Sequence, residues 1–394
     1  MAPTLRTRIN GGSVACRATH SFLIRIVTNL CSFRDVFLVA FPKKSRIENL
    51  HIQTILDSSY KDAELKVSLE TTGLGAVSIK LFDADQKPVS SESANANSET
   101  GSKWTVSIRG QNPHKWTAES PYLYQLIISL DNSQFISTRV GFRQVEIKDG
   151  LLKVNGKRVV FRGVNRHEHH PKFGRAVPLE FLKHDLLTMK RHNINAIRTS
   201  HQLNDPRLLG LADEMGFWMI DEADLECHGF EKVADALLSS AERELPFDQR
   251  QLLTASSAAT WTTDNPDWRD AYVDRAEHLV KRDQLHPSVI MWSLGNEAFY
   301  GRNFKDMYNH IKEYDDSRPI HYEPDSNAET MDVYSRMYLH PNGVAEFGRK
   351  QWGDKDKPLV LCEFVSDLVI ISALTNDSQD SCHGQRPWKH QGIH

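Results

Sequence analysis

The stretch Val289-Ile290-Met291-Trp292-Ser293-Leu294-Gly295-Asn296-Glu297 carries the pattern on which the predicted fold depends. Apolar residues dominate its first six positions, as expected for a strand that is buried on both faces of a parallel sheet. Gly295 then lets the chain leave the sheet, and an amide and a carboxylate follow it. A buried parallel strand that leads into reactive side chains is typical of enzymes whose catalytic groups follow the carboxyl ends of strands.

The same order recurs along the second half of the chain. Strands are predicted to begin near residues 161, 194, 217, 289, 320, 333 and 359, with helices over Leu179–His192, Asp205–Met215, Trp268–Arg282 and Asn303–Tyr314. Six of these strands lead into polar groups, which are Arg166-His167-Glu168, Arg198-Thr199-Ser200-His201, Asp221-Glu222, Asn296-Glu297, Glu323 and Glu363. Alternating strands and helices imply parallel βαβ units. A doubly wound sheet would carry a glycine-rich phosphate loop after its first strand, so a (β/α)8 TIM-type barrel is favoured.

The first half of the chain shows a different sequence pattern, with short strand-like runs and no helical periodicity. Short apolar runs with strand character predict an immunoglobulin-like β-sandwich over residues 45–145, and they lie at 47–56, 63–70, 76–82, 104–108, 123–130 and 134–140. Asp35–Phe41 is predicted to be a further strand, and the Ser/Asn-rich stretch Ser90–Ser102 is predicted to be a loop. Residues 1–44 remain an unassigned segment, and residues 146–394 are predicted to form the barrel.

Composition limits the classes of function that fit. The 394 residues suggest two or three domains. Basic and acidic residues nearly balance, at 48 and 51, so no excess positive charge is present to attract nucleic acid. No apolar run is long enough to cross a membrane. The five cysteines are scattered, which disfavours a disulfide framework and suits a cytoplasmic location.

Glu297 and Glu363 each follow an apolar strand. Two strand-end carboxylates that face one pocket are the minimal set of groups for glycoside hydrolysis. One protonates the leaving oxygen, and the other attacks the sugar or activates water. The alternatives are a structural ion pair at Glu297 and a lone strand-end charge at Glu363.

Glu226 and His228 lie two residues apart, a spacing that puts both side chains on one face of an extended segment. Together with Glu297 they could hold a divalent cation. Oxygen ligands favour Mg²⁺, although histidine is a less usual ligand for it. A hydrogen-bonded surface pair is the alternative. His167 and His201 could donate to sugar hydroxyls or have structural roles.

Seven segments, taken in order, resemble the β-galactosidases of glycoside hydrolase family 2, of the LacZ type, and we expect a fungal member. They are Gly150–Lys157, Arg162–Pro171, Asn195–His201, Ile220–Gly229, His286–Glu297, Ser317–Glu323 and Pro358–Phe364. The resemblance implies retaining hydrolysis of terminal non-reducing β-D-galactose residues from β-galactosides such as lactose, through a covalent galactosyl–enzyme intermediate.

The resemblance also implies roles for individual residues. Glu297 matches the acid/base and Glu363 the nucleophile, whereas Glu226, His228 and Glu297 match the ligands of Mg²⁺. Residues matching the family's substrate-binding positions are His167, His201, Asn296 and Tyr338. The implied partner is a small-molecule β-galactoside, and a homo-oligomer is possible because full-length members often assemble.

The chain departs from the family's pattern at both ends. Only Phe33–Pro42 resembles part of the large N-terminal sandwich, and the family's sequence stops after Phe364. We therefore expect a barrel that is incomplete at its C-terminal end, from a truncated gene model that transcript sequencing would test. Two alternative functions remain. One is another family 2 activity, such as β-glucuronidase or β-mannosidase, against which Arg162–Pro171 argues. The other is an inactive fragment that binds sugar or complements a full-length partner.

Overall fold

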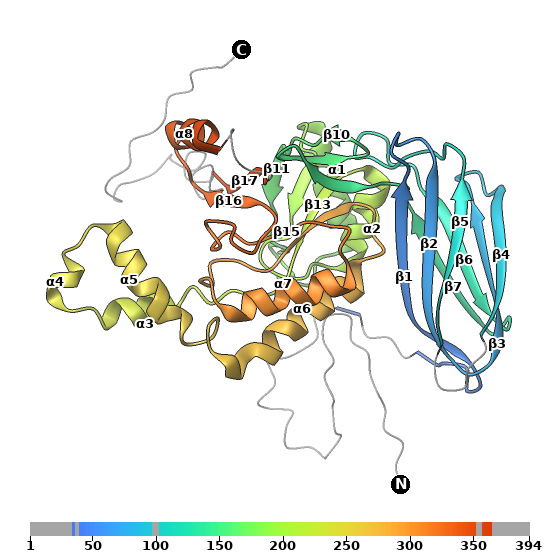
Figure 1. The fold of residues 1–394 in the computed structure, drawn as a ribbon, viewed down its shortest axis with the longest axis horizontal. Helices are drawn as coiled ribbons and strands as arrows, with labels where there is room; N and C mark the ends of the chain where they lie inside the picture. The colour runs from blue at the N-terminus through green and yellow to red at the C-terminus, as the bar shows by residue number, and fades with distance from the viewer. Residues whose placement is uncertain (1–33, 36–38, 97–101, 352–356, 365–394) are drawn as a thin grey trace, which may run out of the picture.

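The computed structural model describes residues 34–35, 39–96, 102–351 and 357–364. Two units lie side by side, a β-sandwich and a larger α/β unit (Figure 1). None of the helices in the described ranges has the length and apolar character needed to span a bilayer.

The sandwich consists of two antiparallel sheets. One has the order β1–β2–β5, with β1 (Arg46–Leu56), β2 (Ala63–Thr72) and β5 (Ser102–Gly110). The other has the order β4–β3–β6–β7, with β3 (Gly75–Phe82), β4 (Pro88–Ala96), β6 (Tyr124–Leu130) and β7 (Gln134–Val140). Buried and half-buried residues alternate along β2, so one of its faces packs into the core. The predicted sandwich is confirmed.

Two local predictions for this half of the chain are wrong. Within Ser90–Ser102, the predicted loop, β4 pairs with β3 along its length, because an edge strand can be polar where its side chains face solvent. In Asp35–Phe41, the predicted strand, Asp35 and residues 39–41 form no strand, and residues 36–38 lie outside the described residues. Val39 and Phe41 are exposed, and no ladder among the described residues provides partners for their backbone groups.

All seven predicted barrel strands are present. They are β11 (Gly163–Asn165), β12 (Ala196–Arg198), β13 (Trp218–Glu222), β14 (Val289–Ser293), β15 (Ile320–His321), β16 (Tyr334–Met337) and β17 (Leu359–Glu363). The first five form one parallel sheet in chain order, and the last two form a separate parallel pair. Asn165 Nδ2 donates to the Cys362 carbonyl at 2.8 Å, so the sheet closes towards a barrel. Residues 365–394, which follow the seventh strand, lie outside the described residues.

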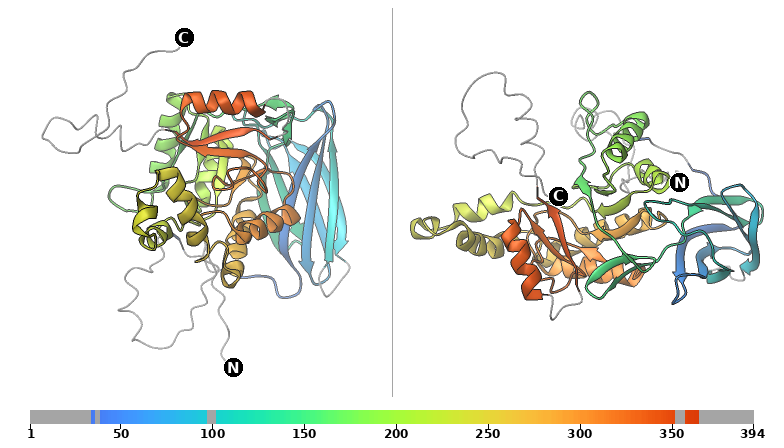
Figure 2. Two further views of the ribbon diagram at one scale, coloured as in Figure 1. Left: turned by 60° about the vertical axis from the view of Figure 1, so that its left-hand side comes forward. Right: turned by 90° about the horizontal axis from the view of Figure 1, so that it is seen from above.

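The four predicted helices are α1 (Leu179–Arg191), α2 (Pro206–Met215), α6 (Arg269–Asp283) and α7 (Arg302–Tyr314). Helices that the sequence did not predict are α3 (Phe230–Ala236), α4 (Ser240–Arg243), α5 (Phe247–Ala259), α8 (Pro341–Gln351) and the short 3₁₀ helix η2 (Pro266–Trp268). Helices α3, α4 and α5 stand away from the strands (Figure 2).

A small sheet of β8 (Val145–Lys148), β9 (Leu151–Val154) and β10 (Lys157–Arg158) follows the sandwich. Its apolar side chains share a core with residues from the barrel strands, so it packs against the barrel. Val145, Leu152 and Val154 pack there with Ile220 and Met291.

Arg143 connects the sandwich to the barrel. Its Nε donates to the Pro287 carbonyl at 2.6 Å, and its Nη2 donates to the Val289 carbonyl at 2.8 Å. Burial, with Arg318 nearby, lowers the pKa of Arg143 to about 9. The side chain therefore remains charged at neutral pH. Its two hydrogen bonds hold the segment from which β14 begins.

The Arg143→Met variant leaves the Pro287 carbonyl without its donor, whereas the Val289 carbonyl keeps the hydrogen bond from Arg318 Nε. We expect it to lower the free energy of unfolding by roughly 1–3 kcal/mol, because a buried unpaired group costs about 1–3 kcal/mol. The control is Arg139→Met, which removes only an exposed ion pair with Glu214 and should cost less than about 1 kcal/mol. Urea denaturation measures both variants, and equal losses would contradict the role given to Arg143.

Candidate active site

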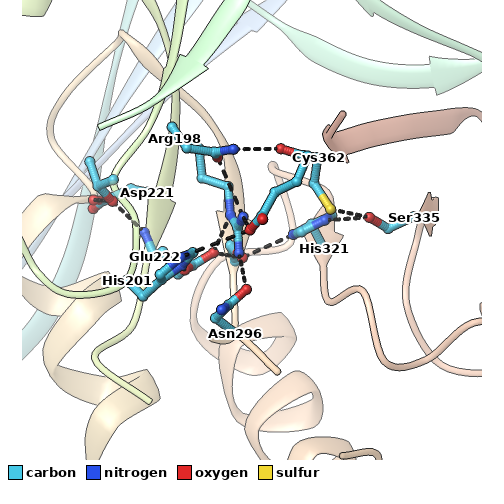
Figure 3. Close-up of polar contacts among 12 residues, drawn as sticks. Arg198, His201, Asp221, Glu222, Asn296, His321, Ser335 and Cys362 are labelled. Atoms are coloured by element: carbon cyan, nitrogen blue, oxygen red, sulfur yellow. Dashed lines mark hydrogen bonds and ion pairs between the residues drawn. The ribbon is translucent and has the colours of Figure 1, made fainter. Parts of the chain in front are cut away.

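One buried guanidinium joins the carboxyl ends of three barrel strands (Figure 3). Arg198 is the last residue of β12 and is 4% exposed. Its Nε donates to Glu222 Oε2 at 2.6 Å, its Nη1 to Glu363 Oε1 at 2.9 Å, and its Nη2 to Asn296 Oδ1 at 3.1 Å. Its position therefore ties β13 and β17 to the loop after β14.

Arg198 and Glu222 form an ion pair that is hidden from solvent. Burial alone would lower the pKa of Arg198, but Glu222 and Glu363 outweigh it and raise that pKa. Burial alone would raise the pKa of Glu222, but Arg198 and His201 outweigh it and lower that pKa. Both groups are therefore charged at neutral pH, and each is the main partner that makes the burial of the other tolerable.

Glu363 is held from two sides. Arg198 donates to Oε1, and the Tyr338 hydroxyl donates to Oε2 at 2.7 Å. The hydrogen bond to Glu363 raises the pKa of Tyr338 to about 12, so the phenol keeps its proton and remains a donor. His201 Nε2 lies 3.9 Å from Oε1. The carboxylate is thus fixed in one orientation at the end of β17.

Glu297 sits where the chain turns sharply after β14. Gly295 has φ +146°, and a Cβ there would lie 2.4 Å from the Leu225 carbonyl oxygen, so only glycine fits this turn. Glu297 itself has φ +33°. Its neighbour Asn296 contacts Arg198, and Tyr338 lies in the field of both Glu297 and Glu363. The two predicted catalytic carboxylates therefore border the same space.

The three predicted metal ligands are also brought together. One ligand atom from each of Glu226, His228 and Glu297 lies within 4.8 Å of the others. His228 Nδ1 is 2.6 Å from Glu297 Oε2, and its Nε2 is 2.9 Å from Glu231 Oε2. Burial would lower the pKa of His228, but Glu297 and Glu231 raise it. Two carboxylates and one imidazole are a donor set that fits a divalent cation.

His167 and His201 lie beside Glu363. Their rings meet edge to face, with centroids 5.2 Å apart. Burial and His201 lower the pKa of His167, whereas Glu226 and Glu363 act in the opposite direction. His201 Nδ1 is 2.8 Å from Glu222 Oε1. Every side chain that the sequence predicted for the site is thus found at this end of the barrel.

Other residues of the site were missed. Arg198 and Glu222 stood out as polar strand ends, but their pairing could not be inferred from spacing. Ser293, His321 and Ser335 are buried polar residues inside strands, and no local pattern marks them. Glu168, from the histidine-rich segment, is structural, since its Oε2 binds Arg34 and its Oε1 accepts from the Asp205 backbone N–H.

Comparison with known families agrees with this arrangement. Residues 145–383 match the TIM barrel domain of glycosyl hydrolases family 2, and residues 45–143 match a second model, Glycosyl hydrolases family 2. The chain belongs to glycosyl hydrolase family 2. The predicted architecture, a β-sandwich followed by a TIM barrel of which this chain contributes part, is confirmed.

Individual relatives extend this comparison. A β-galactosidase of Kluyveromyces lactis is 45% identical over 84% of this chain and 35% of its own length. A β-galactosidase of Priestia megaterium is 38% identical over 84% of this chain and 32% of its own length. The chain thus spans about a third of the length of these relatives. A solved β-glucuronidase of Parabacteroides merdae shares the fold, with a TM-score of 0.63 and 21% identity over 80% of this chain and 39% of its own.

The pair of Glu222 and Arg198 predicts a pH-dependent stability difference. Because folding lowers the pKa of Glu222 below its ordinary value of 4.5, the pair stabilises the fold above that pH, and the stabilisation is lost as the pH falls through the folded-state pKa. At pH 7 the Glu222→Gln variant should be less stable than wild type by roughly 3–5 kcal/mol, because Arg198 stays buried without its charge partner.

This difference should shrink below pH 4.5, and denaturation series at several pH values measure it. Glu214→Gln, at an exposed carboxylate, controls for the loss of one acidic group. A difference between wild type and Glu222→Gln that is constant from pH 7 to pH 3 would show that the charge of Glu222 does not stabilise the fold.

Proposed function

We propose that this chain hydrolyses terminal non-reducing β-D-galactose residues from β-galactosides such as lactose, with retention through a covalent galactosyl–enzyme intermediate. The observation that carries the proposal is the placement of Glu363 and Glu297 beside one space, linked through Arg198 and Asn296. The names of the curated relatives support galactose as the sugar.

In the first step, Glu297 acts as the acid and Glu363 as the nucleophile. Glu297 gives its proton to the glycosidic oxygen as the bond to the anomeric carbon breaks, and a Glu363 oxygen attacks that carbon to form an ester. In the second step, Glu297 takes a proton from water, whose oxygen displaces Glu363. Two inversions give net retention, which requires the two carboxyl groups to lie about 5 Å apart.

Two residues prepare Glu363 for attack. Arg198 and Tyr338 each donate to one of its oxygens, which fixes the carboxylate before the sugar arrives. A fixed nucleophile avoids the loss of orientational freedom that would otherwise add to the barrier. Because the Tyr338 phenol is exposed, it can also move towards the sugar when the ester forms.

Four side chains are proposed to bind the sugar. His201 Nε2 lies 3.9 Å from Glu363, with the His167 ring packed against His201. The Asn296 amide lies in the loop after β14, where its Oδ1 accepts from Arg198. Tyr338 completes the set. Hydrogen bonds from such groups to ring hydroxyls orient the anomeric carbon towards Glu363, and bonds to the 2-hydroxyl can strengthen in the transition state.

Glu226, His228 and Glu297 are the residues that would hold Mg²⁺. A divalent cation there would supply positive charge beside Glu297 and so adjust the proton affinity of the acid/base. His228 must be unprotonated at the ring nitrogen that binds the cation, so binding of the cation competes with the proton that Glu297 and Glu231 favour on His228.

The location and assembly of the protein belong to this proposal as well. The scattered cysteines support a cytoplasmic location of the protein, and Cys227 and Cys362 carry free thiols. A homo-oligomer remains a prediction drawn from the family, and the proposed partner is the small-molecule galactoside.

The activity is tested with nitrophenyl β-galactoside and purified full chain. We expect turnover by wild type, and we expect Glu363→Gln and Glu297→Gln each to lower kcat/KM by at least about 10³-fold, because each removes a group that acts in the transition state. Glu214→Gln, an exposed carboxylate outside the site, is the control and should retain activity.

Other outcomes of that assay reject parts of the proposal. Turnover of the glucuronide or mannoside instead of the galactoside would support another family 2 activity. A silent wild type that becomes active with an added C-terminal fragment would support a complementing fragment. Activity that neither substitution changes would show that the two carboxylates are not catalytic.

The metal site is tested by chelation. Removal of divalent cations with EDTA should lower the wild-type kcat by about tenfold or more, and added Mg²⁺ should restore it. Glu226→Gln should weaken this rescue and raise the Mg²⁺ concentration that it needs. A wild type unaffected by EDTA, with Glu226→Gln equally active, would contradict the proposed cation.

A further inference from the structure

The two parallel sheets of the barrel meet at β15 and β16. Among the described residues, no backbone ladder joins these two strands. One backbone hydrogen bond, from Asp332 N to the Ile320 carbonyl, connects them near their start. Closer to the site, His321 Nε2 lies 2.7 Å from Ser335 Oγ. At that level, the side chain of His321 bridges the sheet that carries Glu297 and the pair that carries Glu363.

His321 is also linked to the charged centre of the site (Figure 3). Its Nδ1 lies 2.9 Å from Ser293 Oγ, and that hydroxyl donates to Glu222 Oε2 at 2.6 Å. Glu222 in turn holds Arg198, which donates to Glu363.

The other side of His321 leads to the same carboxylate. Ser335 Oγ lies 3.2 Å from the sulfur of Cys362, the residue before Glu363. The contacts therefore form a closed ring through β12 to β17.

The partners of His321 determine where its proton lies. The only hydroxyl proton of Ser293 goes to Glu222, because an ionised carboxylate can only accept. Ser293 Oγ must then accept from His321 Nδ1–H. Burial and the nearby charge of Arg198 lower the pKa of His321 to about 3, with Glu222 acting in the opposite direction. The imidazole is therefore neutral. Its bare Nε2 can only accept, so in this tautomer the single hydroxyl proton of Ser335 points to His321 rather than to Cys362 Sγ, the other acceptor within its reach.

We propose that His321, as the neutral Nδ1–H tautomer, is a positioning residue that sets the nucleophile strand β17 against the sheet carrying the acid/base. The inference rests on the proposed function, and it adds a residue that touches neither sugar nor metal. His321 is fully buried, with both ring nitrogens bonded across the gap between the sheets. Losing the bridge would let β16 and β17 shift, and a displacement of about 1 Å at a nucleophile can cost roughly 10²-fold in rate.

Two substitutions at His321 separate positioning from packing. In His321→Gln, the amide can donate to Ser293 and accept from Ser335, so kcat should stay within about threefold of wild type. In His321→Leu, neither bond can form, so kcat should fall roughly 10²-fold with little change in KM. Tyr308→Phe, which removes a hydrogen bond to Asp332 outside the ring, should lower stability without changing kcat. Equal kcat values for the Gln and Leu variants would overturn the proposal.

A second measurement needs neither activity nor the Leu variant. In ¹⁵N-histidine spectra of the full chain, the signals lost in His321→Gln identify His321. We expect them to show a proton on Nδ1 and none on Nε2, unchanged from pH 5 to pH 8. An Nε2–H tautomer, or titration of His321 within that pH range, would contradict the proposed hydrogen bonds from Ser293 through His321 to Ser335. If wild type hydrolyses no galactoside, the proposed function fails while the spectra still test His321. If wild type is active and His321→Leu matches it, the inference alone fails.

Discussion

The buried charge of Arg198 is the constraint on which the candidate site depends. A guanidinium taken out of water costs several kcal/mol unless acceptors surround it, and here the acceptors come from three separate places in the chain. Glu222, Glu363 and Asn296 are each held where Arg198 can reach them. These acceptors lie at the ends of different strands. Arg198 can therefore find all of its partners only when the strand ends lie next to one another. The fold therefore cannot keep its buried arginine without bringing Glu363 and Asn296 together.

This constraint explains how an enzyme site can be built on strands that do not form one continuous sheet. The five-stranded sheet and the β16–β17 pair are joined on one side by Arg198 and Asn165, and on the other by His321 and Ser335. Side-chain hydrogen bonds thus connect strands at places where no backbone ladder among the described residues joins them. Arg198 contacts both Glu363 and Asn296, the residue before Glu297, so one side chain connects the two strand ends that carry these carboxylates.

The sequence predicted the features that depend on neighbouring residues alone, which are the positions of the strands and of the polar residues that follow them. Short runs with apolar residues marked the seven barrel strands, of which β13 and β14 are buried along their whole length, and the polar residues after the strands marked the end that carries the candidate site. Contacts between residues far apart in the sequence could not be predicted. The polar strand β4 forms because it pairs with the edge of β3, and the pairing of Arg198 with Glu222 depends on the adjacent positions of β12 and β13. His321 lies within a strand where a histidine has no distinctive pattern. Glu168 follows a strand in the same way as the predicted site residues, but its carboxylate binds Arg34 and the Asp205 backbone N–H.

The most direct test of the central claim is to trap the covalent intermediate. A 2-deoxy-2-fluoro-β-galactoside with a good leaving group slows the second step, so the sugar should accumulate on the nucleophile. Peptide mass spectrometry should find one fluorogalactosyl group per chain, on Glu363, and none on the Glu363→Gln variant. A label on any other residue, or turnover of the galactoside without a trapped ester, would contradict the account in which Glu363, oriented by Arg198, attacks the sugar.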